Sequence, residues 1–101
     1  MKLYEILIPA NNNNAQRAKW TEAVTHLASG LTIEANVFGA WKDGECHILK
    51  EGMTPVRIAC KADVLANIIL FTCEHYAQKE VFVWVVSPEA AMLRPGELAG
   101  G

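Results

Sequence analysis

The segment Val81–Val86 is apolar at every position, and Ser87 and Pro88 close it. Successive side chains of a strand point to opposite faces of a sheet, so a strand of this composition cannot present either face to water. We expect helices to cover one face and a second copy of the chain or a ligand to cover the other. No catalytic motif accompanies the pattern, so the sequence predicts a fold and an association surface rather than a reaction.

The first third of the chain predicts a strand followed by a helix. The strand is Lys2–Ile8, and its core-facing side carries Tyr4, Ile6 and Ile8. The helix begins at Ala15, with Asn14 as its N-cap and Gly30 at its C-terminal end. Its apolar residues recur at helical spacing, at Trp20, Val24, Leu27 and Leu31.

The middle of the chain predicts a β-hairpin. Asp43 and Gly44 form the strongest turn signal, because glycine tolerates the positive φ that a tight hairpin turn requires. If these two residues make the whole turn, the first arm is Thr32–Lys42, and Phe38 pairs with Leu49. This register places on one face Glu34, Asn36, Phe38, His47, Leu49 and Glu51.

The rest of the chain completes a familiar order of elements. The second arm continues as Val56–Cys60 beyond Gly52, a candidate bulge, and a helix follows over Ala62–Ala77. With the last strand, the order is βαββαβ, which is the ferredoxin-like order of the α+β class. We therefore predict an antiparallel four-stranded sheet in the spatial order 4-1-3-2 with two helices on one face. Residues 1–88 form the single domain, and residues 89–101 form a flexible C-terminal tail.

The helix-free face of this predicted sheet is strongly apolar. It collects Leu3, Leu7, Phe38, Leu49, Phe82, Trp84 and Val86. Such a patch is larger than soluble monomers usually expose. We predict a homodimer through this face, because a twofold copy buries the same patch on both partners.

Composition narrows the remaining classes of function. Nine basic and eleven acidic side chains give a net charge of −2 without a run of either sign, so neither nucleic acid nor a membrane surface is an expected partner. The apolar start of the chain is too short for a signal peptide and no stretch is long enough to span a membrane, which predicts a cytoplasmic protein. Three cysteines, an odd number, suggest reduced thiols.

Metal and cofactor sites are not expected. Cys46 and His47 are adjacent on a strand and point to opposite faces, and Cys73 and His75 lie about 200° apart around a helix. Neither pair converges on one ion. The chain has no glycine-rich phosphate loop and no nucleophile elbow, so we predict neither a metal nor a cofactor.

One group of residues combines aromatic walls with charges on the helix-free face. This candidate ligand site consists of Phe38, His47, Glu51, Arg57 and Trp84. His47 is the candidate catalytic base, because a histidine beside carboxylates exchanges protons near neutral pH. Arg57 either forms a structural ion pair with Glu5 on the neighbouring strand or anchors an anionic ligand.

Three short motifs resemble an uncharacterised group of small bacterial proteins. They are Gly30-Leu31-Thr32, Gly39-Ala40-Trp41, and Glu51 followed by Val56-Arg57-Ile58. The resemblance spans about Leu3 to Val86, and orphan proteins of mobile gene cassettes look similar. It implies a ferredoxin-like fold and no established activity.

Three functions remain open on this basis. The first is a homodimeric module that binds a small apolar or anionic molecule between its sheets. The second is a cofactor-independent oxygenase or isomerase of the dimeric α+β barrel kind, with His47 as base and Arg57 as anion anchor. The third is a protein–protein interaction module that docks a different chain on the helix-free face.

Overall fold

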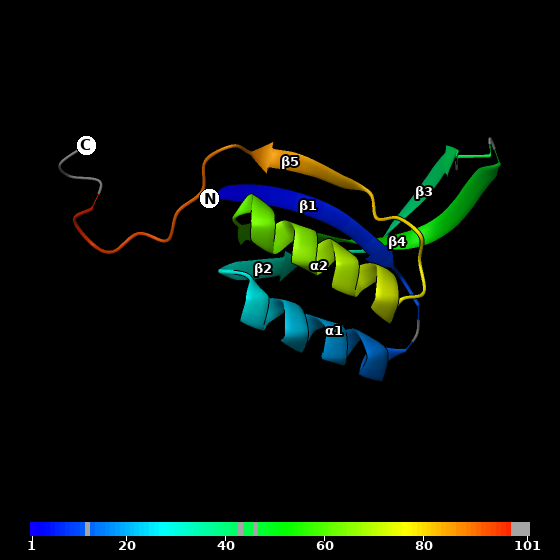
Figure 1. The fold of residues 1–101 in the computed structure, drawn as a ribbon, viewed down its shortest axis with the longest axis horizontal. Coiled ribbons are helices and arrows are strands. Elements are labelled where there is room, and N and C mark those ends of the chain that lie inside the picture. The colour runs from blue at the N-terminus through cyan, green and yellow to red at the C-terminus, as the bar shows by residue number, and fades with distance from the viewer. Residues whose placement is uncertain (12, 43, 46, 98–101) are drawn as a thin grey trace.

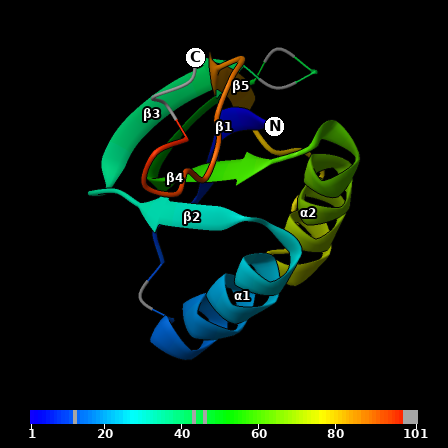
Figure 2. The same cartoon turned by 90° about the vertical axis from the view of Figure 1, so that its left-hand side faces the viewer.

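The structure is a computed structural model that describes residues 1–11, 13–42, 44–45 and 47–97. Its elements, in chain order, are β1 (Lys2–Pro9), α1 (Asn14–Leu27), β2 (Gly30–Ile33), β3 (Val37–Lys42), β4 (Ile48–Cys60), α2 (Ala62–His75) and β5 (Val83–Ser87). Both helices pack on the same face of one curved sheet (Figures 1 and 2). None of the helices in the described part of the chain is long and apolar enough to cross a membrane.

The sheet has the spatial order β2-β4-β1-β5, and β3 also pairs with β4. All of these pairs are antiparallel. If β3 is set aside, this is the order expected of a ferredoxin-like sheet, so the predicted α+β fold class is confirmed. Strand β4 is the longest, with 13 residues, and contacts three of the other four strands.

The predicted first hairpin arm is two strands rather than one, which makes the sheet five-stranded. Strand β2 pairs with the C-terminal half of β4 and β3 with its N-terminal half. The chain leaves the ladder between them, and there Asn36 accepts a hydrogen bond of 2.6 Å from the Thr54 hydroxyl. The bond links the segment between β2 and β3 to β4.

The predicted hairpin register is wrong. Trp41 pairs with Leu49 and Phe38 with Gly52, so the connection comprises residues 43–47 rather than Asp43 and Gly44 alone. Asp43 itself lies outside the described residues. A turn signal acts on a few residues, whereas the register follows the ladder as a whole. The ladder also runs through Gly52 without a shift, so the bulge considered there is absent.

The bulge of this sheet lies in β5 instead. Tyr4 pairs with Val85 and Leu3 with Ser87, which leaves Val86 as the extra residue. The strand itself is Val83–Ser87 rather than the predicted Val81–Val86, and Ser87 stands opposite Leu3.

The core lies between the sheet and the helices, on the side predicted from the first strand. Its fully buried large side chains include Ile6, Ile8, Trp20, Val24, Ile58 and Ile68. At its centre, the indole N–H of Trp20 donates a hydrogen bond of 3.0 Å to the hydroxyl of Thr72, which donates to the carbonyl of Ile68 at 2.6 Å. This chain of bonds joins the two helices and satisfies the buried polar groups of Trp20 and Thr72.

The ends of α1 differ from prediction by a few residues. Its N-cap is Asn13 rather than Asn14, and the Asn13 side chain accepts the Gln16 N–H at 3.0 Å. At the other end Ala28 is extended, so Gly30 begins β2 instead of closing the helix. Leu27 consequently lies at the edge of the core and is 44% exposed.

We predict that Thr72→Val lowers the free energy of unfolding by about 1–3 kcal/mol, because it leaves the buried Trp20 N–H without an acceptor while preserving side-chain volume. Thr25→Val is the matched control, since Thr25 makes the same backbone bond at 2.6 Å on an exposed helix surface. We expect the control to change stability by less than about 0.5 kcal/mol. Urea denaturation measures both, and equal losses would contradict a central role for this bond.

Candidate functional site

The sheet face opposite the helices, here called the open face, contains the predicted binding region. It carries Leu3, Glu5, Leu7, Pro55, Arg57, Phe82 and Trp84. Residues directly opposite each other on neighbouring strands point to the same face of a sheet. Glu5 is opposite both Arg57 and Trp84, and Leu7 is opposite Pro55, so these side chains share one face. Among the described residues, no helix lies over this face (Figure 2).

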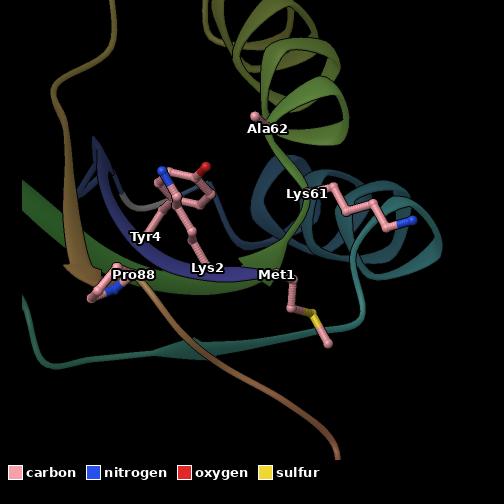
Figure 3. Close-up of a pocket in the computed structure, with 6 residues that line it drawn as sticks. All are labelled: Met1, Lys2, Tyr4, Lys61, Ala62 and Pro88. Carbon is pink, nitrogen blue, oxygen red and sulfur yellow. The ribbon is translucent and has the colours of Figure 1, made fainter.

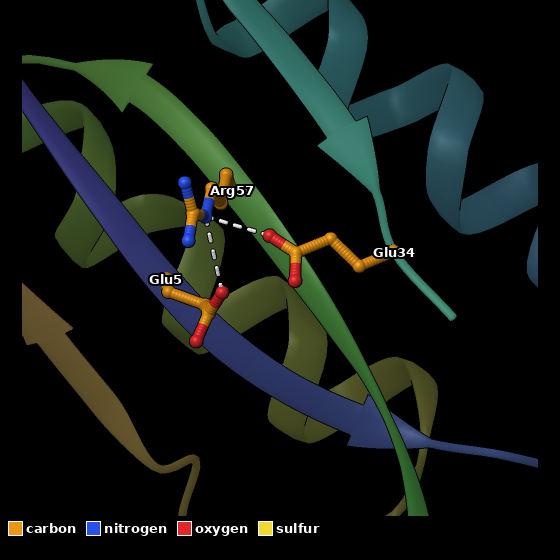
Figure 4. A network of polar contacts seen from close by, with 3 residues as sticks. All are labelled: Glu5, Glu34 and Arg57. Atoms are coloured by element: carbon orange, nitrogen blue, oxygen red, sulfur yellow. Dashed lines mark hydrogen bonds and ion pairs between the residues drawn. The ribbon is translucent and has the colours of Figure 1, made fainter. Parts of the chain in front are cut away.

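An ion-pair network occupies the centre of the open face (Figure 4). The Arg57 Nε lies 3.2 Å from Glu5 Oε1 and 2.6 Å from Glu34 Oε1. The predicted Glu5–Arg57 pair is thereby confirmed. Glu34 is a partner that sequence reasoning placed near His47, because the wrong hairpin register moved it along the sheet. One guanidinium between two carboxylates leaves the network with a net negative charge.

The three members of this network differ in their contact with water. The side chain of Glu5 is only 8% exposed, whereas those of Arg57 and Glu34 are 45% and 34% exposed. A buried carboxylate is costly without a cation, so Arg57 has a structural role toward Glu5. Its terminal guanidinium nitrogens have no hydrogen bond to other groups in the described part of the chain, and they remain available to an anion.

Two aromatic side chains stand beside this network. Phe82 and Trp84 pack edge to face with ring centroids 5.1 Å apart. They are nevertheless 55% and 38% exposed. The open face therefore exposes its largest apolar side chains next to a half-buried arginine.

The structure does not bring the five predicted site residues together within one chain. Arg57 and Trp84 both flank Glu5, but Phe38 lies on β3 opposite Gly52 and is 74% exposed. Glu51 pairs with Gly39, the neighbour of Phe38, so these two side chains leave opposite faces of the hairpin.

The candidate base is the most distant member of the group. His47 precedes β4, is 69% exposed and lies 3.7 Å from a carboxylate oxygen of Glu45. Arg57 follows ten residues later in the same chain, which corresponds to roughly 30 Å along an extended strand. Within one chain, a small molecule therefore cannot contact both His47 and Arg57. The predicted combination of His47 as base and Arg57 as anion anchor is not possible within a single chain.

The described residues hold no group of three or more histidine, cysteine or acidic side chains that is able to bind a metal ion. Cys60 and Cys73 are free thiols, and Cys46 lies outside the described residues. Burial raises the pKa of the Cys60 thiol, and the nearby carboxylate of Asp63 raises it further. A thiol that resists ionisation is a poor nucleophile, so Cys60 is a core residue.

Comparisons with known proteins identify the fold. No protein-family model matches the chain, and no curated protein matches it. Solved structures do match. A divalent cation tolerance protein (CutA1) from Thermus thermophilus is 9% identical with a TM-score of 0.65, over 97% of this chain and 91% of that protein.

Two further solved structures give the same result. CutA1 from Oryza sativa is 10% identical with a TM-score of 0.65, over 90% of this chain and 82% of that one. The periplasmic divalent cation tolerance protein CutA from Archaeoglobus fulgidus is 12% identical with a TM-score of 0.62, over 90% and 86%. At this level of identity the likeness shows a shared ferredoxin-like fold.

We predict that Arg57→Met destabilises the protein by about 2–3 kcal/mol, because it strands the Glu5 carboxylate in a buried position. Glu5→Gln combined with Arg57→Met is expected to recover most of this loss, since the double variant buries no charge. Glu34→Gln is the control and costs less than about 1 kcal/mol, because Glu34 is more exposed. Chemical denaturation provides the values, and a double variant as unstable as Arg57→Met would contradict the role of the pair.

We also predict that Cys60 in the folded protein is alkylated by iodoacetamide at mildly alkaline pH about tenfold or more slowly than in urea, because burial keeps the thiol protonated and inaccessible. The raised pKa means that the folded chain holds this proton more tightly than the unfolded chain. Its contribution to stability is therefore complete at neutral pH and declines as the pH rises beyond the ordinary thiol range. Peptide mapping measures the labelling, and Cys60→Ala should reduce the alkaline loss of stability.

Proposed function

We propose that this protein is a self-associating binding module that buries its open face against a second copy of the same chain. The observation that carries the proposal is the exposed Phe82–Trp84 pair beside the half-exposed Arg57 on a face without helices. Aromatic side chains, tryptophan above all, and arginine supply much of the binding energy at protein interfaces. Here Arg57 lies on the interior strand β4, and the two aromatic residues lie on or next to the edge strand β5.

A second copy is favoured over other occupants by the nature of the patch. The open face is broad and built from regular strands, so a twofold partner would cover it with an identical surface. The chain also has a small net charge of −2, which opposes self-association only weakly. An apolar sheet surface packs well against another sheet, at the spacing found in sheet sandwiches.

The ligand of such an assembly is proposed to be a small molecule with an apolar body and an anionic group. Phe82 and Trp84 would contact the apolar part, and the unbonded guanidinium nitrogens of Arg57 would bind the anion. His47, Phe38 and Glu51 lie on the hairpin that projects past the helices, so they belong to this site only if another copy brings them there (Figure 1). Catalysis by His47 therefore depends on assembly.

The names of the similar structures refer to divalent cations, and this property is a separate candidate. In a single chain, the carboxylates of Glu5 and Glu34 approach each other, but Arg57 already lies between them and supplies the positive charge. Arg57 therefore competes with a metal ion for the two carboxylates. Binding of a divalent cation is therefore measured separately from self-association.

We expect sedimentation velocity at concentrations up to about 100 µM to give an oligomer, and the double variant Phe82→Ser with Trp84→Ser to shift it toward the monomer. Leu70→Ser is the matched control, because Leu70 is 60% exposed on α2, away from the open face. A wild-type monomer throughout this range, or equal effects of the two sets of substitutions, would contradict the proposal. Titration calorimetry with copper or zinc salts measures whether the protein binds a divalent cation.

A further inference from the structure

A cleft of about 280 Å³ lies at one end of the molecule, where β1 and α2 both begin (Figure 3). It is lined by Met1, Lys2, Tyr4, Lys61, Ala62 and Pro88. Tyr4 belongs to the helix side of β1, so the cleft is separate from the open face and from the proposed self-association. Its volume is close to the lower range of small-molecule sites.

The first turn of α2 supplies backbone donors to this cleft. The helix has 14 residues, and its N-cap, Lys61, makes no side-chain capping bond. The first bond within the helix runs from the Leu65 N–H to the Lys61 carbonyl at 3.0 Å. The N–H groups of residues 62–64 therefore have no partner within the helix, and they carry the positive end of its dipole. Ala62 leaves them sterically accessible, since its side chain is a single methyl group.

Tyr4 supplies a second hydrogen-bonding group to the cleft, independent of the helix. The residue is only 6% exposed, yet its hydroxyl makes no hydrogen bond within the described part of the chain. The hydroxyl oxygen is not one of the fully buried polar atoms, so it opens onto the cleft although the ring is buried. In Figure 3 the ring of Tyr4 directs its hydroxyl oxygen toward the side where Ala62 begins α2. The unmatched hydroxyl and the unmatched helix N–H groups thus border the same space.

The charges around the cleft favour an anion. Lys2 extends beside Tyr4, whereas Lys61 turns away from it, and both lysines are exposed and able to reorient (Figure 3). Asp63 is the opposing charge, since it lies in the first turn of α2, but it does not line the cleft. The bulge of β5 falls opposite Leu3 and Tyr4, and bulges of this kind commonly lie beside binding sites.

We propose that this cleft binds the phosphate group of a small phosphorylated ligand. The helix N–H groups and the Tyr4 hydroxyl would donate hydrogen bonds to its oxygens, and Lys2 would neutralise its charge. A phosphate fits these donors better than a planar carboxylate does, because they come from a helix end, a buried ring and a flexible cation in three different directions.

The test is a titration of the protein with inorganic phosphate at constant ionic strength, followed by amide NMR. Saturable shifts are expected at the amides of residues 62–64. Tyr4→Phe should weaken binding about fivefold to tenfold without changing the melting temperature, because the hydroxyl has no partner in the fold. Lys2→Gln should also weaken binding, whereas Lys79→Gln, which removes an exposed lysine outside the cleft, should not.

Two further measurements complete the design. Asp63→Asn should strengthen phosphate binding, since it removes the opposing charge from the first turn of α2. Acetate should bind more weakly than phosphate. The proposal is overturned by shifts that do not saturate, by a Tyr4→Phe variant that binds like the wild type, by equal effects of the two lysine substitutions, or by equal binding of acetate. Because the open face is untouched by these variants, this test is independent of the oligomeric state.

Discussion

The ladder between β1 and β4 is the constraint on which the rest of the molecule depends. Eight residue pairs join the two central strands, from Lys2 with Cys60 to Pro9 with Met53. Each pair fixes two side chains on one side of the sheet, so this single register decides what is buried under the helices and what reaches the open face. A slip of one residue would move Glu5 into the apolar core.

The two faces of this ladder are stabilised in different ways. On the helix side, apolar packing is completed by the bonds from Trp20 to Thr72 and from Thr72 to Ile68. On the open face, a buried Glu5 is balanced by Arg57, and two aromatic rings contact each other while remaining accessible to water. The helix side therefore buries most of its apolar area within one chain, although the buried Tyr76 hydroxyl there has no hydrogen-bond partner. The open face instead leaves apolar side chains and guanidinium N–H groups exposed to water.

The two proposed sites follow from this difference and from the helix termini. The open face offers apolar area and a guanidinium, which suits another copy of the chain and an anionic ligand between copies. The cleft beside α2 offers donors without partners in a small space, which suits one compact anion. The two proposed sites use opposite faces of β1, on which Tyr4 and Glu5 are adjacent.

The sequence by itself determined the fold class, the order of the elements and the side of β1 that forms the core, since these depend on local periodicity. It also determined the Glu5–Arg57 pair, because both residues occupy positions set by long, regular strands. The hairpin register was decided by tertiary structure. Asp43 and Gly44 predict a turn only locally, whereas the ladder of β3 with β4 fixed the pairing and separated Phe38 from Glu51. The cleft at Tyr4 likewise required the folded chain, because residues distant in sequence meet there and no local pattern records which hydroxyl is left without a partner.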